Sequence, residues 1–475
     1  MTIRIPDWLK RNISIRPRVC RPPSRWERRL GKGFRVLTIL CLMWFALWRV
    51  QLHYRITRQF QVIRSAGLPA SPQELNRWYA AVPESSNAAI ALTRAFELLR
   101  TFPDERSNVI TQANLLDRRT AWSEETSEQI GEYDAMNREA LAQAREAVQL
   151  PLCRYPVDLA YGMEAALPHL SKLKSLARAA GLRAATAANE GHQTDWPSDV
   201  RLMLRLAATL DHEPTLSSQL VRDSIITIAV KTTERCLNSA ATNEAICRML
   251  ESFAGAESTN GIRIGLIGER ACMTPAFRLS WAEWLRVGKT EEDQSPKTKP
   301  SPLGGHANPL IWFSGFFERD LSFYLRAMKT NIGLAALPVA TSLNLTIVSE
   351  PLSGAASRQG YFFSAITLTA IEKAIVRDAQ TRAHIRLVQA ALAVECYRVL
   401  HHNFPENLAN LTPAFLTVVP IDPFTGEPLR YRRTDSGFVL YSVDRDGLDN
   451  GGLQKPLKAK FSDPTNYDLT FTVER

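Results

Sequence analysis

The feature that most constrains this chain is an uncharged apolar run, Val36–Trp48, which directly follows a strongly basic segment. Residues 1–35 contain eleven Lys and Arg residues but only two acidic ones, so their net charge is +9. The other 440 residues carry 47 basic and 46 acidic groups, so the net charge of +10 belongs almost wholly to the N-terminal tail. Basic residues beside an apolar helix stay on the cytoplasmic side of a membrane, and the pattern is therefore a topology signal.

The apolar run has 13 residues, fewer than the ~20 that a helix needs to cross a bilayer. Its flanks extend it, because Arg35 and Arg49 can reach the lipid headgroups and the nearby aromatic residues suit the interface. We therefore predict a transmembrane signal anchor over residues 34–54, preceded by a basic cytoplasmic tail over residues 1–33. This topology describes a single-pass inner-membrane protein with a cytoplasmic N-terminus and most of its chain in the periplasm.

Three other interpretations of the run compete with an anchor. A cleaved signal peptide has an apolar run of this length, but no small-x-small cleavage site follows it. A helix in the plane of the membrane would have a polar face, which Val36–Trp48 lacks. A buried core helix would not need the basic tail. We expect the tail to contact anionic lipid headgroups, and the nearly neutral remainder argues against nucleic acid as a partner.

Helical signals dominate the part of the chain beyond the anchor. Ser71-Pro72 is a typical helix start, and Leu202, Leu206 and Leu210 recur at helical spacing. A polar segment rich in Pro and Gly interrupts the pattern at residues 288–310, which predicts a linker or exposed loop. The cysteines of this part are scattered without a C-x-x-C pair, so we expect buried free thiols with at most one disulfide.

The last quarter of the chain has a different pattern. A long helix is predicted to begin at about Phe362 and to end at His401-His402-Asn403, and Leu429–Arg433 and Phe438–Val443 flank a turn as the two strands of a β-hairpin would. Tyr467–Val473 is a candidate final strand.

The sequence therefore predicts a mainly α fold: a single N-terminal transmembrane helix, an irregular or repeat-like helical extracytoplasmic domain and a small C-terminal α+β module with a β-hairpin. The expected divisions are 1–33 (tail), 34–54 (anchor), 55–287 (helical domain), 288–310 (linker or loop), 311–361 (a connecting segment docked on the helical domain) and 362–475 (long helix and β module).

A series of short motifs in this module resembles the C-terminal half of the major pseudopilins of type II secretion systems, over about residues 380–455. The matching residues include Asn403-Phe404-Pro405, Val419-Pro420, Asp422-Pro423 and Asp446-Gly447. In that family the loop after the last hairpin binds calcium. The resemblance implies that Asp444, Asp446, Asp449 and Asn450 are metal ligands here, and calcium does prefer several oxygens from a flexible loop. An ordinary solvated Asp-Gly turn is the alternative.

The chain also departs from the pseudopilin pattern, because several hundred residues separate its apolar run from the matching helix. As a whole it resembles a group of uncharacterised bacterial envelope proteins that carry this module, a resemblance that implies no activity. No metalloprotease, nucleophile-elbow or phosphate-loop motif occurs, so we expect no enzyme and no catalytic residues. The expected role is interaction with a protein partner, or scaffolding, in the envelope, in association with a secretion or pilus-like system. An anchored envelope hydrolase and an atypical pseudopilin-like subunit are the alternatives.

Overall fold

The computed structural model describes residues 25–112, 114–191, 196–239, 244–257, 260–278, 314–337, 351–457 and 467–474. The chain forms two compact units, residues 1–55 and 56–475. The predicted linker at 288–310 and most of the predicted basic tail lie outside the described residues.

The first unit contains most of helix α2 (Arg25–Ser65). In the part of the chain that the structure describes, one helix is long and apolar enough to cross a membrane, the Arg29–Ser65 portion of α2. Large apolar side chains such as Leu42 and Trp44 are exposed along it. The helix extends beyond the predicted span of 34–54 at both ends. Its flanks are rich in Arg and Gln, which favour helix, and at 1.5 Å per residue its 41 residues are about twice as long as a bilayer core is thick.

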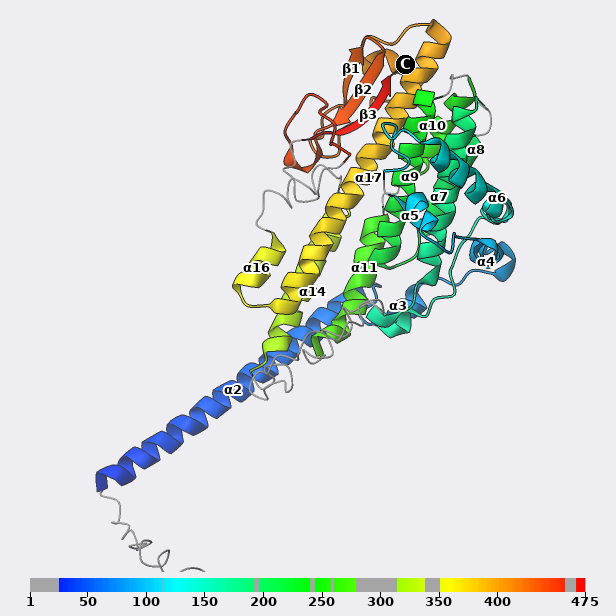
Figure 1. Cartoon of the computed structure of the whole chain (residues 1–475). Coiled ribbons are helices and arrows are strands. Elements are labelled where there is room, and N and C mark those ends of the chain that lie inside the picture. Colours follow the sequence, from blue (N-terminus) through cyan, green and yellow to red (C-terminus); the bar gives the residue numbers. More distant parts are fainter. Residues whose placement is uncertain are drawn as a thin grey trace, which may run out of the picture. The chain divides into compact units, whose positions relative to one another are not determined.

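The second unit is mainly helical (Figure 1). Its elements in chain order are α3 (Pro72–Trp78), η1 (Glu84–Ser86), α4 (Ala88–Leu98), α5 (Arg106–Thr111), α6 (Glu124–Ala147), η2 (Leu159–Glu164), α7 (Pro168–Asn189), α8 (Trp196–Ala208), α9 (Leu216–Ser239), η3 (Glu244–Arg248), α10 (Met249–Ala254), α11 (Gly261–Met273), η4 (Thr274–Arg278), α14 (Phe316–Leu334), α16 (Leu352–Arg358), α17 (Phe362–His401), η6 (Leu408–Leu411), β1 (Arg430–Thr434), β2 (Gly437–Ser442), η7 (Asp444–Asp446) and β3 (Leu469–Glu474).

Helices α7, α8 and α9 pack against one another, and α17 packs along α9. Figure 1 shows α14 and α16 beside the N-terminal half of α17 and the sheet beside its C-terminal half. The predicted start at Ser71-Pro72 is confirmed, because the Ser71 hydroxyl accepts a hydrogen bond from the Glu74 N–H at 3.3 Å. Helix α14 and helix α16 fill much of the segment that we expected to be a connection at 311–361.

Glycines set the distance between α11 and the loop that precedes α9. A Cβ atom built on Gly268 would lie 1.7 Å from the Pro214 carbonyl oxygen, and one on Gly265 would lie 3.3 Å from the Leu216 Cα. The two glycines are one turn apart and let the backbones approach more closely than any side chain allows. Their spacing in the sequence therefore reflects helix packing.

The C-terminal strands form an antiparallel sheet in the order β1-β2-β3, so β3 lies at an edge. Side chains of α9 cover that edge. Asn238 Oδ1 accepts a hydrogen bond from the Glu474 N–H at 2.7 Å, and Asn238 Nδ2 donates to the Thr472 carbonyl at 2.8 Å. Glu234 Oε1 accepts from the Thr472 N–H at 2.8 Å. The unpaired backbone groups of an edge strand thus find partners within the same chain, which prevents pairing with another strand.

A disulfide joins Cys247, in η3, to Cys396, in α17, with 5.8 Å between the two Cα atoms. This agrees with the expectation of at most one disulfide. The other described cysteines, Cys41, Cys153, Cys236 and Cys272, are free thiols. The bridge ties two elements that are 149 residues apart in the sequence.

We predict that Gly268→Ala lowers the free energy of unfolding by about 1–3 kcal/mol, the usual cost of forcing extra volume into a packed interior. Gly333→Ala is the control, because its Cβ would meet no atom within 4 Å and alanine favours helix by about 0.5–1 kcal/mol. Chemical denaturation of the full chain in a non-ionic detergent measures both. Equal stability of the two variants would contradict the packing role of Gly268.

We also predict a pH dependence from Glu234, because burial raises the pKa of this carboxyl to about 7, above its ordinary value of 4.5. Between these two values the folded state holds a proton that the unfolded state has released, so the free energy of unfolding falls as the pH rises. The limit is about 1.4 kcal/mol per pH unit for one proton.

Denaturation at pH 5 and pH 7 tests this prediction. Glu234→Gln should remove the Glu234 part of the slope, whereas the exposed Glu97→Gln should leave the slope unchanged. The same pH dependence in wild type and Glu234→Gln would show that Glu234 does not titrate in this range.

Candidate functional site

The predicted calcium ligands lie in the loop after β2, and each carboxylate already has a protein partner. Asp444 accepts hydrogen bonds from Gln380 Nε2 at 2.9 and 3.2 Å, and burial raises the pKa of this carboxyl. Asp446 Oδ1 accepts from the Leu448 N–H at 3.1 Å, an Asx turn. The loop is thus folded around backbone and amide donors.

Asp449 is held by two donors. Its Oδ1 accepts from the Gly451 N–H at 2.9 Å and its Oδ2 from Arg430 Nε at 2.8 Å. The hydrogen bond from Gly451 and the neighbouring Arg430 charge lower the pKa of this carboxyl. Asn450 uses its side-chain amide to donate to the Leu448 carbonyl at 3.2 Å.

A further carboxylate, Asp468, directly precedes β3 and accepts hydrogen bonds from this loop. Its two oxygens accept from the N–H groups of Asn450 at 3.4 Å and Gly452 at 2.7 Å. Sequence reasoning missed Asp468 because it lies 16 or more residues beyond its partners. Among the described residues no three His, Cys, Asp or Glu side chains are grouped as metal ligands. As arranged, both oxygens of Asp444 and of Asp449 are taken by protein donors, whereas Asp446 Oδ2 is buried without a hydrogen-bond partner among the described residues.

Asp422, which belongs to the same set of motifs, is fully buried beneath this loop. Its Oδ1 accepts from the Phe424 N–H and the Ser442 hydroxyl, both at 2.9 Å, and its Oδ2 accepts from the Val443 N–H at 3.0 Å. Arg430 lies 3.6 Å from the same carboxylate. Asp422 therefore fixes the turn before β1 against the end of β2, a structural role.

A buried polar cluster brings a serine, a histidine and a carboxylate together inside the helical body. His169 Nε2 lies 2.9 Å from Glu213 Oε1, and the Ser218 hydroxyl donates to the same oxygen at 2.6 Å. The ring of Tyr155 stacks on His169 with 4.0 Å between centroids. In a catalytic triad the serine would bond to the histidine, whereas here both bond to one carboxylate oxygen. The serine and the histidine thus share one acceptor, which is not the arrangement of a triad, and the second oxygen of Glu213 is buried without a hydrogen-bond partner among the described residues.

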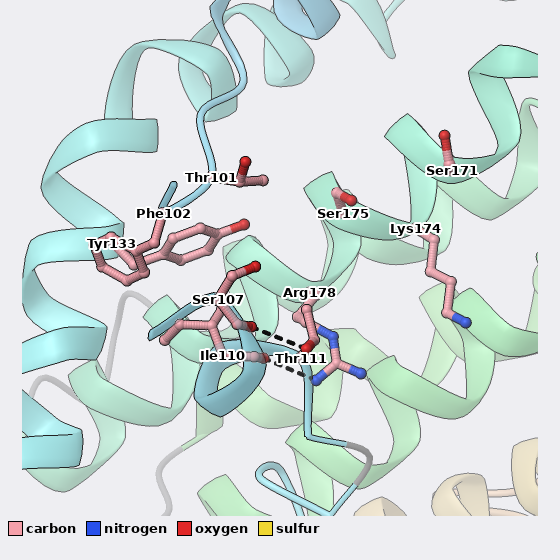
Figure 2. Close-up of a pocket in the computed structure, with 10 residues that line it drawn as sticks. All are labelled: Thr101, Phe102, Ser107, Ile110, Thr111, Tyr133, Ser171, Lys174, Ser175 and Arg178. Carbon is pink, nitrogen blue, oxygen red and sulfur yellow. Dashed lines mark hydrogen bonds between the residues drawn. The ribbon is translucent and has the colours of Figure 1, made fainter. Parts of the chain in front are cut away.

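Figure 2 shows a hollow of about 270 Å³ between the segment around α5, helix α6 and helix α7. Phe102 and Tyr133 form its aromatic side, and Arg178 donates to the Ile110 and Gln112 carbonyls at 3.2 and 2.9 Å. Lys174, by contrast, points away from the aromatic pair (Figure 2). The remaining lining residues are Thr101, Ser107, Thr111, Ser171 and Ser175. The hollow has no carboxylate for acid–base chemistry, and its arginine is already held by backbone.

Two more hollows adjoin each other along α8, because Arg201 and Arg205 line both. Their volumes are about 480 and 310 Å³. We call them together the arginine groove, which is lined by Arg145, Arg201, Arg205, Arg222 and Arg248 and by one carboxylate, Glu251. Burial raises the pKa of Asp199 to about 6 and that of Glu234 to about 7, but neither carboxyl lines any of the three hollows.

A scan against protein-family models, a search of curated proteins and a search of solved structures each returned no match to this chain.

Calcium binding by the C-terminal loop stays a prediction with a direct test. If Asp444, Asp446 and Asp449 exchange their present donors for the ion, calcium should raise the melting temperature of the full chain and a chelator should reverse the effect, because a ligand stabilises the state that binds it. Asp446→Asn should abolish the shift, whereas the exposed Asp435→Asn should keep it. No shift in the wild type would leave the loop an Asp-Gly turn.

Proposed function

We propose that this protein is a membrane-anchored interaction or scaffold protein of the bacterial envelope, without catalytic activity of its own. In this proposal α2 is a single-pass signal anchor in the inner membrane, with the basic tail in the cytoplasm and residues from about 55 onward in the periplasm. The eleven basic residues before and at the edge of the apolar run support this orientation. The tail would contact anionic headgroups.

The observation that carries the proposed location is the disulfide between Cys247 and Cys396. Disulfides persist in oxidising compartments such as the periplasm and are rare in the cytosol. Both cysteines lie after the apolar helix, on the side that the charge pattern assigns to the periplasm. Two independent features, one electrostatic and one covalent, therefore support the same topology.

An interaction role is supported by the arginine groove, which leaves cationic side chains on the surface of a packed helical body. The C-terminal module supports a link to a secretion or pilus-like system, since a 40-residue helix is followed by a small antiparallel sheet in the part that carries the pseudopilin-like motifs. We propose that β1 and β2, which pair antiparallel, correspond to the hairpin of that family.

The topology predicts the redox state of the cysteines in cells. Labelling of denatured whole-cell protein with a maleimide polymer should attach two more labels after reduction than before it, because Cys247 and Cys396 are bonded. Cys247→Ser should remove this difference, and Cys236→Ser, a free buried thiol, should retain it. Equal labelling of the wild type with and without reductant would contradict a periplasmic body.

The scaffold role has its own measurement. A membrane-impermeant cross-linker applied to cells with a permeabilised outer membrane should convert the chain into a discrete heavier species, whose mature N-terminus still contains the basic tail. A chain that remains uncross-linked at every dose would contradict the scaffold role. A mature N-terminus at Phe34, where Lys32-Gly33-Phe34 resembles a prepilin-type processing site, would instead indicate a processed pseudopilin-like subunit.

A further inference from the structure

The five arginines of the arginine groove are not equivalent. Three of them are held by contacts within the chain: Arg145 pairs with Asp199, Arg205 donates to the Gln149 side chain at 2.9 Å, and Arg222 pairs with Asp211 at 2.5 Å. Arg222 also donates to the Ala256 carbonyl at 2.7 Å. These contacts fix the walls of the groove and neutralise part of its charge.

Arg201 and Arg248 are different, because both are exposed and neither has an ion pair or side-chain hydrogen bond within the described part of the chain. Arg201 and Arg205 are four residues apart on α8, so they lie on one helix face. Arg248 lines the same hollow from η3, next to the disulfide cysteine Cys247, which holds that segment against α17. Two guanidinium groups without an ion pair in the described part of the chain therefore border one hollow from two elements, and the single carboxylate that lines it, Glu251, is paired with neither.

The floor between these cations is apolar. Leu204, Ala207 and Ile226 line it, and no aromatic ring is among the residues that line either hollow. A sugar ring would thus find no flat apolar platform on which to stack. A peptide with carboxylates on either side of an apolar side chain matches the groove better, since guanidinium forks bind carboxylates in two-point contacts and leave the apolar side chain to the floor.

We propose that the arginine groove binds an acidic peptide segment of the protein partner. Arg201 and Arg248 contact its carboxylates, and the apolar floor lined by Leu204, Ala207 and Ile226 receives an apolar side chain. Clusters of arginine are a general means of recognising acidic motifs. This inference rests on the proposed interaction role and names the chemistry of the partner.

The test uses the full chain in non-ionic detergent and a short fluorescent peptide that alternates glutamate with leucine. Fluorescence anisotropy near physiological salt should show saturable binding, and a glutamine–leucine peptide should not bind. Arg201→Glu combined with Arg248→Glu should weaken binding at least about tenfold, the effect of losing a single charge-assisted contact. Arg94→Glu, an exposed arginine on α4, should bind like the wild type.

The basic tail is the main competing site, because it too attracts carboxylates. Binding that survives Arg201→Glu and Arg248→Glu would assign the peptide to the tail and overturn the proposal. Equal binding of the glutamine peptide would overturn the role of charge. Binding of anionic lipid vesicles that is lost in the same double variant, without peptide binding, would assign the groove to headgroups instead.

Failure of the groove can be separated from failure of the proposed function. If the chain still cross-links to a partner in cells when Arg201 and Arg248 are both replaced by Glu, the groove proposal fails and the scaffold role stands. If the wild type binds the peptide but gives no cross-linked species in cells, the scaffold role fails.

Discussion

The contact between α9 and the edge of β3 is the interaction on which the second unit depends. Helix α9 packs against α7, α8, α11 and α17 and, through Glu234 and Asn238, completes the hydrogen bonds of β3. A three-stranded sheet has little core of its own and would be marginal alone. By supplying partners to an edge strand, α9 makes the small C-terminal sheet part of the same body as the helices and protects it from pairing with other chains.

The same framework shapes the arginine groove. Helix α9 contributes Arg222 and Ile226 to the groove, α8 contributes Arg201 and Arg205, and the segment held by the disulfide contributes Arg248. Three arginines make internal contacts that hold these elements in place, and the other two are available to a ligand. A groove built on packed helices and fixed by a covalent bond loses little conformational entropy when it binds, which favours affinity.

Features that depend on local sequence could be predicted. The apolar N-terminal helix and the approximate extent of α17 follow from periodicity, and the start at Ser71-Pro72 follows from capping; both signals act over a few residues. The pairing of Glu234 with Thr472 could not be predicted, because the two residues are 238 positions apart and neither has a motif. The arginine groove was missed for a related reason: arginines are spread throughout the chain, and only the fold shows which of them have no internal partner.

The C-terminal loop combines residues that its local sequence identifies with partners that only the fold brings to them. The predicted ligands Asp444 and Asp449 lie in this loop, but their partners Gln380 and Arg430 come from α17 and β1 and have no signal in the loop's own sequence. The most direct test of the central claim, a groove for acidic peptides on the packed helical body, is hydrogen–deuterium exchange of the full chain with the glutamate–leucine peptide. The account predicts slower exchange in α8 and in the η3–α10 segment, with α4 unchanged. Protection confined to the basic tail, or absent from α8, would contradict it.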